Sequence, residues 1–180
     1  MVVRSKTGRD KVPGVPGLPE APQAPVDPAR LDIAYLGFFL GLRVTELVLE
    51  KGVASGFRGM RESHGYLVQH LIESERSITE LARRMNVSQQ AASKSIAELV
   101  KGGVVESRPA KDRRARRVRL SKRGWDAVRS SRRARQTIEA RLQHAVGEKA
   151  YDDARATLIA CLDALGGLSR VRTRRIRSPR

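Results

Sequence analysis

The sequence predicts a mainly α fold with one small β-hairpin. Apolar residues recur at three- and four-residue spacing along most of the chain, as in helices that bury one face. Two short runs, 104–108 and 116–120, instead alternate as strands do and are joined through residues 109–115. With 40% hydrophobic residues in 180, the chain has enough apolar surface for one ordinary domain.

The first helix is expected over residues 28–50. Asp27 suits the N-cap position, and Pro28 suits the first helical position. The helix is apolar on nearly every side, with Phe38 and Phe39 among its large residues. Because one small domain cannot easily bury so much apolar surface, part of this helix is expected to face a second copy of the chain.

Two further helices are expected on either side of a tight turn. Ser63 can cap the helix before them, and Ser77-Ile-Thr-Glu80 has the pattern of a capping box. Asn86 tolerates the left-handed conformation that ends helices, and Ser88 can cap the next helix almost at once. The sequence therefore predicts helix, tight turn, helix.

The second helix of this pair leads into the predicted hairpin. Its apolar residues run from Ala92 to Leu99 at four- and three-residue spacing, and the helix is expected to end at residues 102–103. After the hairpin, Ser121 can cap a long helical region that reaches residue 166 and is interrupted near Gly147. The whole is a winged helix-turn-helix, over about residues 62–121, flanked by N- and C-terminal helices.

The charge of the chain predicts an anionic partner. Its 36 Lys and Arg against 19 Asp and Glu give a formal charge of +17. Seven basic residues and one acid, Asp112, lie between Arg108 and Arg119. This density favours nucleic acid over a membrane surface, since Arg43 and Glu46 follow the apolar run 33–42 too closely for a membrane span.

Both ends of the chain differ from the middle. Six prolines recur at every third position from 13 to 28, which indicates a disordered or semi-rigid leader over residues 1–27. Residues 169–180 hold six arginines and no acid, and this tail is expected to be disordered until it meets phosphate. Neither end resembles a secretion signal, so the cytoplasm, at the nucleoid, is the expected location.

The residue types of an enzyme are not grouped in this sequence. No Ser/His/Asp or Cys/His pairing, phosphate-cradling glycine loop or metal-ligand spacing is visible, so no catalysis, cofactor or metal is expected. The single cysteine, Cys161, lies in an apolar helical pattern and is interpreted as a buried structural thiol.

Three segments resemble the multiple antibiotic resistance regulator (MarR) family of bacterial transcription factors. They are the helix-turn-helix Ser77-Ile-Thr-Glu-Leu-Ala-Arg-Arg-Met-Asn-Val-Ser-Gln-Gln-Ala-Ala-Ser-Lys94, then Gly103-Val-Val-Glu106, and the wing Asp112-Arg-Arg-Ala-Arg-Arg-Val-Arg-Leu-Ser-Lys-Arg-Gly124. The resemblance covers about residues 31–168, within a domain expected over 28–168. It implies an obligate homodimer, with dimerisation helices over 28–50 and 122–166, that binds a palindromic site in double-stranded DNA.

The resemblance also implies which residues meet DNA. The recognition helix would enter the major groove and the wing the minor groove, and Asp112 would pair with Arg114 to hold the wing. Glutamine can bond bidentately to adenine, and lysine can reach guanine or phosphate. The candidates are Ser88, Gln89, Gln90, Ser93 and Lys94 on the helix, and Arg108, Lys111, Asp112, Arg113, Arg114 and Arg116 on the wing.

Many members of the family bind small aromatic or phenolic effectors beside the dimerisation helices. The residues that could line such a pocket here, by element position, are Tyr35, Arg61, His64, His70 and Trp125. Two functions stay open at this point. One is a sequence-specific regulator, most simply a repressor, that an effector can release from DNA. The other is an architectural protein that coats nucleic acid without sequence preference or effector control.

Overall fold

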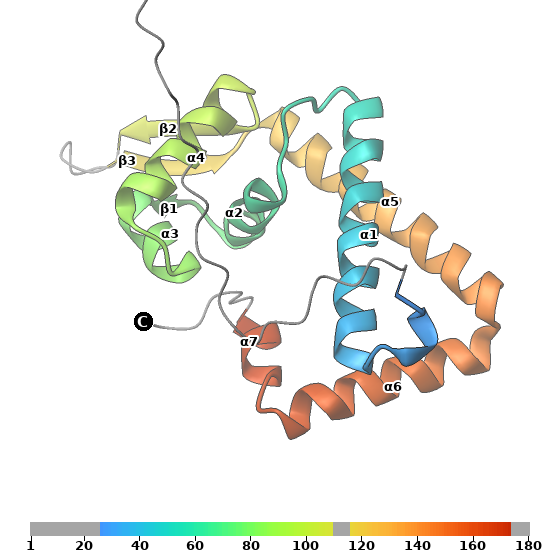
Figure 1. Cartoon of the computed structure of the whole chain (residues 1–180). Coiled ribbons are helices and arrows are strands. Elements are labelled where there is room, and N and C mark those ends of the chain that lie inside the picture. Colours follow the sequence, from blue (N-terminus) through green and yellow to red (C-terminus); the bar gives the residue numbers. More distant parts are fainter. Residues whose placement is uncertain (1–25, 110–115, 174–180) are drawn as a thin grey trace, which may run out of the picture. The chain divides into compact units, whose positions relative to one another are not determined.

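The structure, a computed structural model, describes residues 26–109 and 116–173 of the chain (Figure 1). The chain divides into two compact units, 1–38 and 39–180. In the first unit, a single 3-10 turn, η1 (Pro28–Arg30), precedes the start of helix α1 (Ile33–Ala54). Asp27 Oδ1 accepts a hydrogen bond from the Ala29 N–H, so Asp27 and Pro28 begin this turn and not the long helix. The prediction of a helix over 28–50 is wrong at both ends.

The start of α1 is explained by a second aspartate. Asp32 Oδ1 accepts a hydrogen bond from the backbone N–H of Tyr35 at 2.8 Å, which satisfies one of the free donors of the first helical turn. The helix then continues four residues beyond the expected end at Glu50. Because proline and aspartate suit both a 3-10 turn and a helix start, the sequence pattern could not distinguish the two.

The second unit contains a three-helix group beside a small sheet. The helices are α2 (Glu62–Glu73), α3 (Ile78–Met85) and α4 (Gln89–Lys101). The antiparallel sheet has the strand order β1 (Arg76–Ser77), β3 (Arg116–Leu120), β2 (Val105–Pro109). Its core joins one leucine from each helix to the central strand: Leu67, Leu81, Leu99 and Val118 are fully buried. The predicted mainly α fold with a β-hairpin wing is confirmed.

Strand β1 was not predicted. Its two residues pair with β3, Arg76 opposite Val118 and Ser77 opposite Arg117. The hairpin itself has the expected alternation, since Val118 and Leu120 are buried, Arg119 between them is half-buried, and Arg117 before them is exposed. β1 therefore fastens the start of the helix-turn-helix to the wing.

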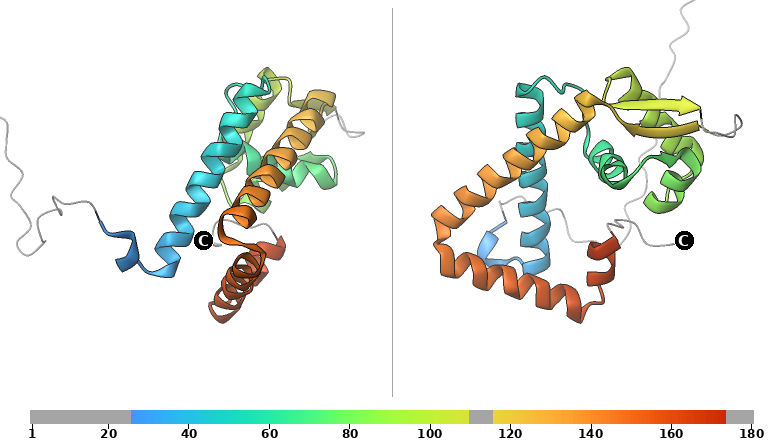
Figure 2. Two further views of the ribbon diagram at one scale, coloured as in Figure 1. Left: turned by 90° about the vertical axis from the view of Figure 1, so that its right-hand side faces the viewer. Right: turned by 180° about the vertical axis from the view of Figure 1, so that it is seen from behind.

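Three helices follow the hairpin: α5 (Lys122–Val146), α6 (Glu148–Ala164) and α7 (Leu168–Thr173). Gly147, at φ 84°, separates α5 from α6, and the chain changes direction there (Figure 2). The interruption near Gly147 was predicted, but α7 was not, and residues 169–173 of the expected disordered tail are helical. Cys161 on α6 is half-buried, so the prediction of a buried thiol holds only in part.

The junction between hairpin and α5 depends on Ser121. Its hydroxyl accepts from the Gly124 N–H at 2.9 Å as the N-cap of α5, and it lies within hydrogen-bonding distance of the Gly103 and Val104 carbonyls. The predicted cap at this position is confirmed. No helix in the described part of the chain is long and apolar enough to cross a membrane.

Candidate nucleic-acid interface

Helix α4 has one face in the core and one in solvent. Ala92, Ile96 and Leu99 are at most 4% exposed, as the spacing predicted, and they hold the helix against the rest of the second unit. On the opposite side lie all five residues proposed to read DNA, and each is exposed: Ser88, Gln89, Gln90, Ser93 and Lys94. The fold thus presents hydrogen-bonding side chains on a rigid helix.

Three local features, all predicted from the sequence, define the helix-turn-helix: a capping box at the start of α3, a left-handed residue at its end and an N-cap on α4. Ser77 Oγ accepts from the Glu80 N–H while Glu80 Oε2 accepts from the Ser77 N–H, which completes the capping box of α3. The hydrogen bond from the Ser77 backbone N–H is the main cause that lowers the pKa of Glu80. Asn86 is left-handed at φ 51°, and Ser88 Oγ accepts from the Ala91 N–H at 3.1 Å. Together these contacts fix the angle at which α4 leaves α3.

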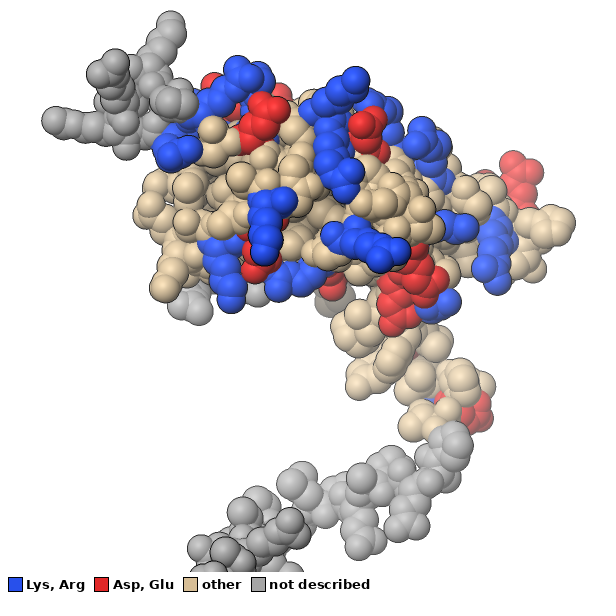
Figure 3. All heavy atoms as spheres, turned by 90° about the horizontal axis from the view of Figure 1, so that it is seen from above, with Lys and Arg blue, Asp and Glu red and all other residues tan. Residues whose placement is uncertain are grey.

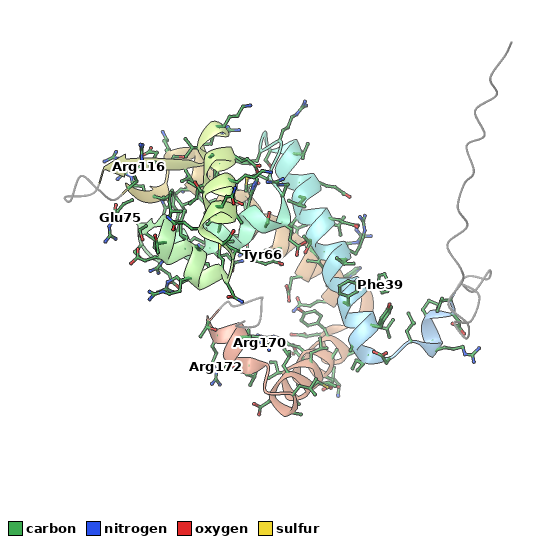
Figure 4. The ribbon with its side chains drawn as sticks, turned by 60° about the vertical axis from the view of Figure 1, so that its left-hand side comes forward. Phe39, Tyr66, Glu75, Arg116, Arg170 and Arg172 are labelled. Atoms are coloured by element: carbon green, nitrogen blue, oxygen red, sulfur yellow. The ribbon has the colours of Figure 1, made fainter. Side chains whose placement is uncertain are left out.

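The hairpin supplies a second set of cations. Arg119 makes two hydrogen bonds to Glu106 Oε2, and Arg108 lies 3.6 Å from the same atom, so one carboxylate holds both arginines. Arg116 donates to Ser107 Oγ at 2.9 Å beside the outer end of the hairpin (Figure 4). The remaining proposed wing residues lie outside the described residues: Lys111, Asp112, Arg113 and Arg114.

Positive charge extends beyond the hairpin. In Figure 3, Lys and Arg side chains are spread over the visible face with fewer Asp and Glu between them. Glu75 lies within reach of Arg117, with 4.0 Å between Oε1 and Nε, and so offsets one of these cations (Figure 4). The excess of unpaired cations suits a polyanionic partner.

A separate cavity of about 350 Å³ lies between α1, α2 and α5 within the second unit. Its walls are largely apolar, with Phe57, Val68 and Val128 among them. The polar residues that line it are Thr45, Arg61, Glu62, Tyr66, Gln69, Ser131, Arg132 and Arg135. Three arginines against one acid make the cavity suitable for an anionic molecule with an apolar body.

Tyr66 and Glu62 form a hydrogen-bonded pair in this wall (Figure 4). The bond to the Glu62 carboxylate, together with burial, raises the pKa of Tyr66 to about 12. Because the Glu62 carboxylate accepts the hydrogen bond that the Tyr66 O–H donates, Glu62 has a partner within the protein. The cationic groups of the cavity are its three arginines, which suit an anion.

Of the residues predicted to line a pocket, Arg61 does so. His64 is buried beside Glu98 of α4, His70 is buried in α2, and Trp125 is 38% exposed; none of these three lines the cavity. The structure does not bring these three residues to this cavity, and their assignment to an effector site stays a prediction. Tyr35 belongs to the first unit, and the lining residues of the cavity belong to the second.

Most of the lining was missed at the sequence level because it comes from three helices far apart in the chain. Arg132 and Arg135, three residues apart on α5, carry the clearest signal, since this spacing places both on one side of a helix near the apolar Val128. Tyr66 was assigned to the apolar side of α2, and its hydroxyl was not considered.

The fold and the exposed helix define the class: this is a winged helix-turn-helix protein of the kind used to bind DNA. Residues 58–115 match the model of the MarR family. The match covers the helix-turn-helix and the first strand of the wing, and it confirms the resemblance seen in the sequence. A search of curated proteins finds no match.

Several solved structures share this fold. YusO of Bacillus subtilis has 21% identity and a TM-score of 0.60, over 74% of this chain and 93% of that chain. A MepR–DNA complex of Staphylococcus aureus has 15% identity and a TM-score of 0.59, over 73% and 98%. MarR of E. coli without ligand has 18% identity and a TM-score of 0.55, over 75% and 97%. The chain therefore shares the fold of these proteins.

Proposed function

We propose that the protein is a transcriptional regulator that binds double-stranded DNA sequence-specifically. The observation that carries the proposal is the outer face of α4, where two glutamines, two serines and a lysine are exposed on a helix that the core holds in place. These side chains can bond to base edges in the major groove. The DNA-bound structure of MepR, which has the same fold, supports this assignment.

The wing is proposed to add contacts on either side of the major groove. Arg113 and Arg114 at its tip would probe the narrow, electronegative minor groove, and Asp112 would pair with Arg114. Arg108 and Arg116, which are exposed on the hairpin, would contact phosphate and increase affinity without reading sequence.

A homodimer is proposed as the active form. Within the second unit, large apolar residues are exposed on two helices, which is costly for a protein that works as a monomer. They are Phe39, Leu40 and Leu42 on α1, and Leu158, Ile159 and Leu162 on α6. A second copy that covered these faces would place two α4 helices on one DNA duplex, and the DNA site would then be palindromic.

The cavity supports a proposal of effector control. A small aromatic acid or phenol that occupied it would contact both α2 of the winged helix and α5, so binding could shift the two relative to each other. We propose that the protein acts in the cytoplasm as a repressor that such a molecule releases. The alternative, an architectural DNA-binding protein without effector control, explains the charge but leaves the apolar cavity without a role.

Selection of bound fragments from random duplex DNA tests the proposal. The regulator predicts enrichment of one motif with two inverted half-sites about one helical turn, roughly 10 base pairs, apart. Two chains should be bound to each fragment. Recovery of fragments without a shared motif would favour the architectural alternative.

A further inference from the structure

One side chain belongs both to the cavity and to a contact with the recognition helix. Arg61, the N-cap residue of α2, lines the cavity. Its guanidinium also forms an ion pair with Glu98, which lies on α4 four residues after Lys94. The two residues are far apart in sequence, so this pair is a direct link between the cavity and the helix proposed to read DNA.

A buried histidine contacts the same carboxylate oxygen, beside Arg61. His64 is 2% exposed, and its Nε2 lies 3.0 Å from Glu98 Oε2. Its Nδ1 accepts a hydrogen bond from the Arg61 backbone N–H at 3.3 Å, so in the neutral ring the proton is on Nε2 and is donated to Glu98. These hydrogen bonds, from His64 first and then Arg61, lower the pKa of Glu98, which is therefore a carboxylate at neutral pH.

A ligand in the cavity can compete with Glu98 for Arg61, because the Arg61 side chain is accessible. Its side chain is 55% exposed, whereas His64 is enclosed, so an anion in the cavity can reach the guanidinium but not the imidazole. A guanidinium can bind a carboxylate through two parallel hydrogen bonds, whether that carboxylate belongs to Glu98 or to a ligand in the cavity. An anionic ligand and Glu98 would thus compete for the same donor.

We propose that Arg61 and Glu98 form the coupling contact of this protein: an anionic aromatic ligand in the cavity takes Arg61 from Glu98 and so weakens DNA binding. The inference rests on the proposed function. Loss of the ion pair weakens the link between α4 and the start of α2, where the hydrogen bond from His64 to Glu98 remains. It also leaves the carboxylate of Glu98 without its cation on the helix that approaches phosphate, where negative charge is repelled.

The test uses the full chain, the DNA fragment obtained by selection, and naphthoate as the probe, with naphthalenemethanol as its uncharged counterpart. For the wild type, saturating naphthoate should weaken binding of the selected fragment by about fivefold or more, and the alcohol should not. Glu98→Gln removes the competing charge, so this variant should bind naphthoate more tightly and its DNA affinity should change less than twofold when naphthoate is added.

Two further variants make the result specific. Glu46→Gln removes the same charge from an exposed pair with Arg43 on α1, and it should respond to naphthoate as the wild type does. Arg61→Met keeps most of the side-chain stem, and it should bind naphthoate weakly and show no response in DNA binding. This variant gives a second measurement if Glu98→Gln is poorly folded.

The outcomes separate the inference from the proposed function. A Glu98→Gln variant that loses as much DNA affinity with naphthoate as the wild type would overturn the coupling role. So would a wild type whose binding to the selected fragment is unchanged by naphthoate. A wild type with no preference for the selected fragment over random DNA would instead refute the regulator itself.

Discussion

Gly124 packs directly against the backbone carbonyl of Val104, at a distance that leaves no room for a Cβ atom at position 124. The contact joins the first turn of α5 to the residue that precedes β2. It explains why the Leu-Ser-x-x-Gly pattern ends in glycine: the serine caps the helix, and the glycine lets the helix meet the chain before the hairpin.

Replacement of Gly124 by alanine should therefore destabilise the fold by about 1–3 kcal/mol, because the backbone must move to accept the methyl group. Urea denaturation measures this change. Gly65→Ala on α2 is the matched control, since nothing lies within 4 Å of its added Cβ and helix propensity favours alanine by about 0.5–1 kcal/mol. Equal stability of both variants would show that α5 and the hairpin do not meet as described.

Ser121→Ala should cost about 1–2 kcal/mol, because it removes the N-cap of α5 and the hydrogen bonds to the carbonyls before β2. Ser63→Ala is the control variant, because the sequence pattern predicted a cap at Ser63 whereas the structure has Arg61 as the N-cap of α2. Ser63 was expected to cap α2, but it lies inside the first turn and is exposed, so its loss should change stability by less than about 0.5 kcal/mol. A larger loss of stability in Ser63→Ala would show that Ser63 caps α2, as the sequence pattern predicted.

The capping box of α3 predicts a pH dependence of stability. The pKa of Glu80 in the folded protein lies below its ordinary value of 4.5. Its stabilising contribution is therefore complete above that value and is lost as the pH falls through the folded-state pKa. Glu80→Gln should be less stable than the wild type by about 0.3–1 kcal/mol at neutral pH, and denaturation at successively lower pH should show this difference shrinking. A constant difference would contradict the assignment.

The wing predicts a DNA-binding effect that depends on position and not on charge alone. Arg114→Ala should weaken binding of the selected fragment by about 1 kcal/mol or more at moderate salt, because it removes a minor-groove cation and the proposed partner of Asp112. Arg133→Ala removes the same charge from the exposed surface of α5 and should have a smaller effect. Titrations of both variants at one salt concentration make the comparison.

Local signals explain most of what could be predicted. Ser77, Asn86, Ser88 and Ser121 act on backbone groups within three or four residues, and the structure confirms each. At the start of α2 the same logic was misleading. There the backbone N–H of Arg61, the N-cap residue, donates to the ring of His64. Glutamate or glutamine usually accepts this hydrogen bond in a capping box, so the sequence pattern did not indicate Arg61. Ser63 was assigned as the cap instead.

Long-range features were not predictable in the same way. Strand β1 has two residues and exists because β3, about forty positions later, supplies its partners. The cavity and the Arg61–Glu98 pair likewise depend on how separate helices pack. Periodicity shows which face of a helix is buried, but not which other helix it meets.

Reading of DNA sequence by the exposed face of α4 is tested most directly by the ratio of affinities for the selected fragment and for a shuffled duplex. Both affinities are measured at one salt concentration, for the wild type and for Gln90→Ala. We expect a wild-type ratio of roughly a thousand or more, lowered about tenfold or further in the variant, whose affinity for shuffled DNA should be nearly unchanged. A wild-type ratio near one would show that α4 does not read sequence.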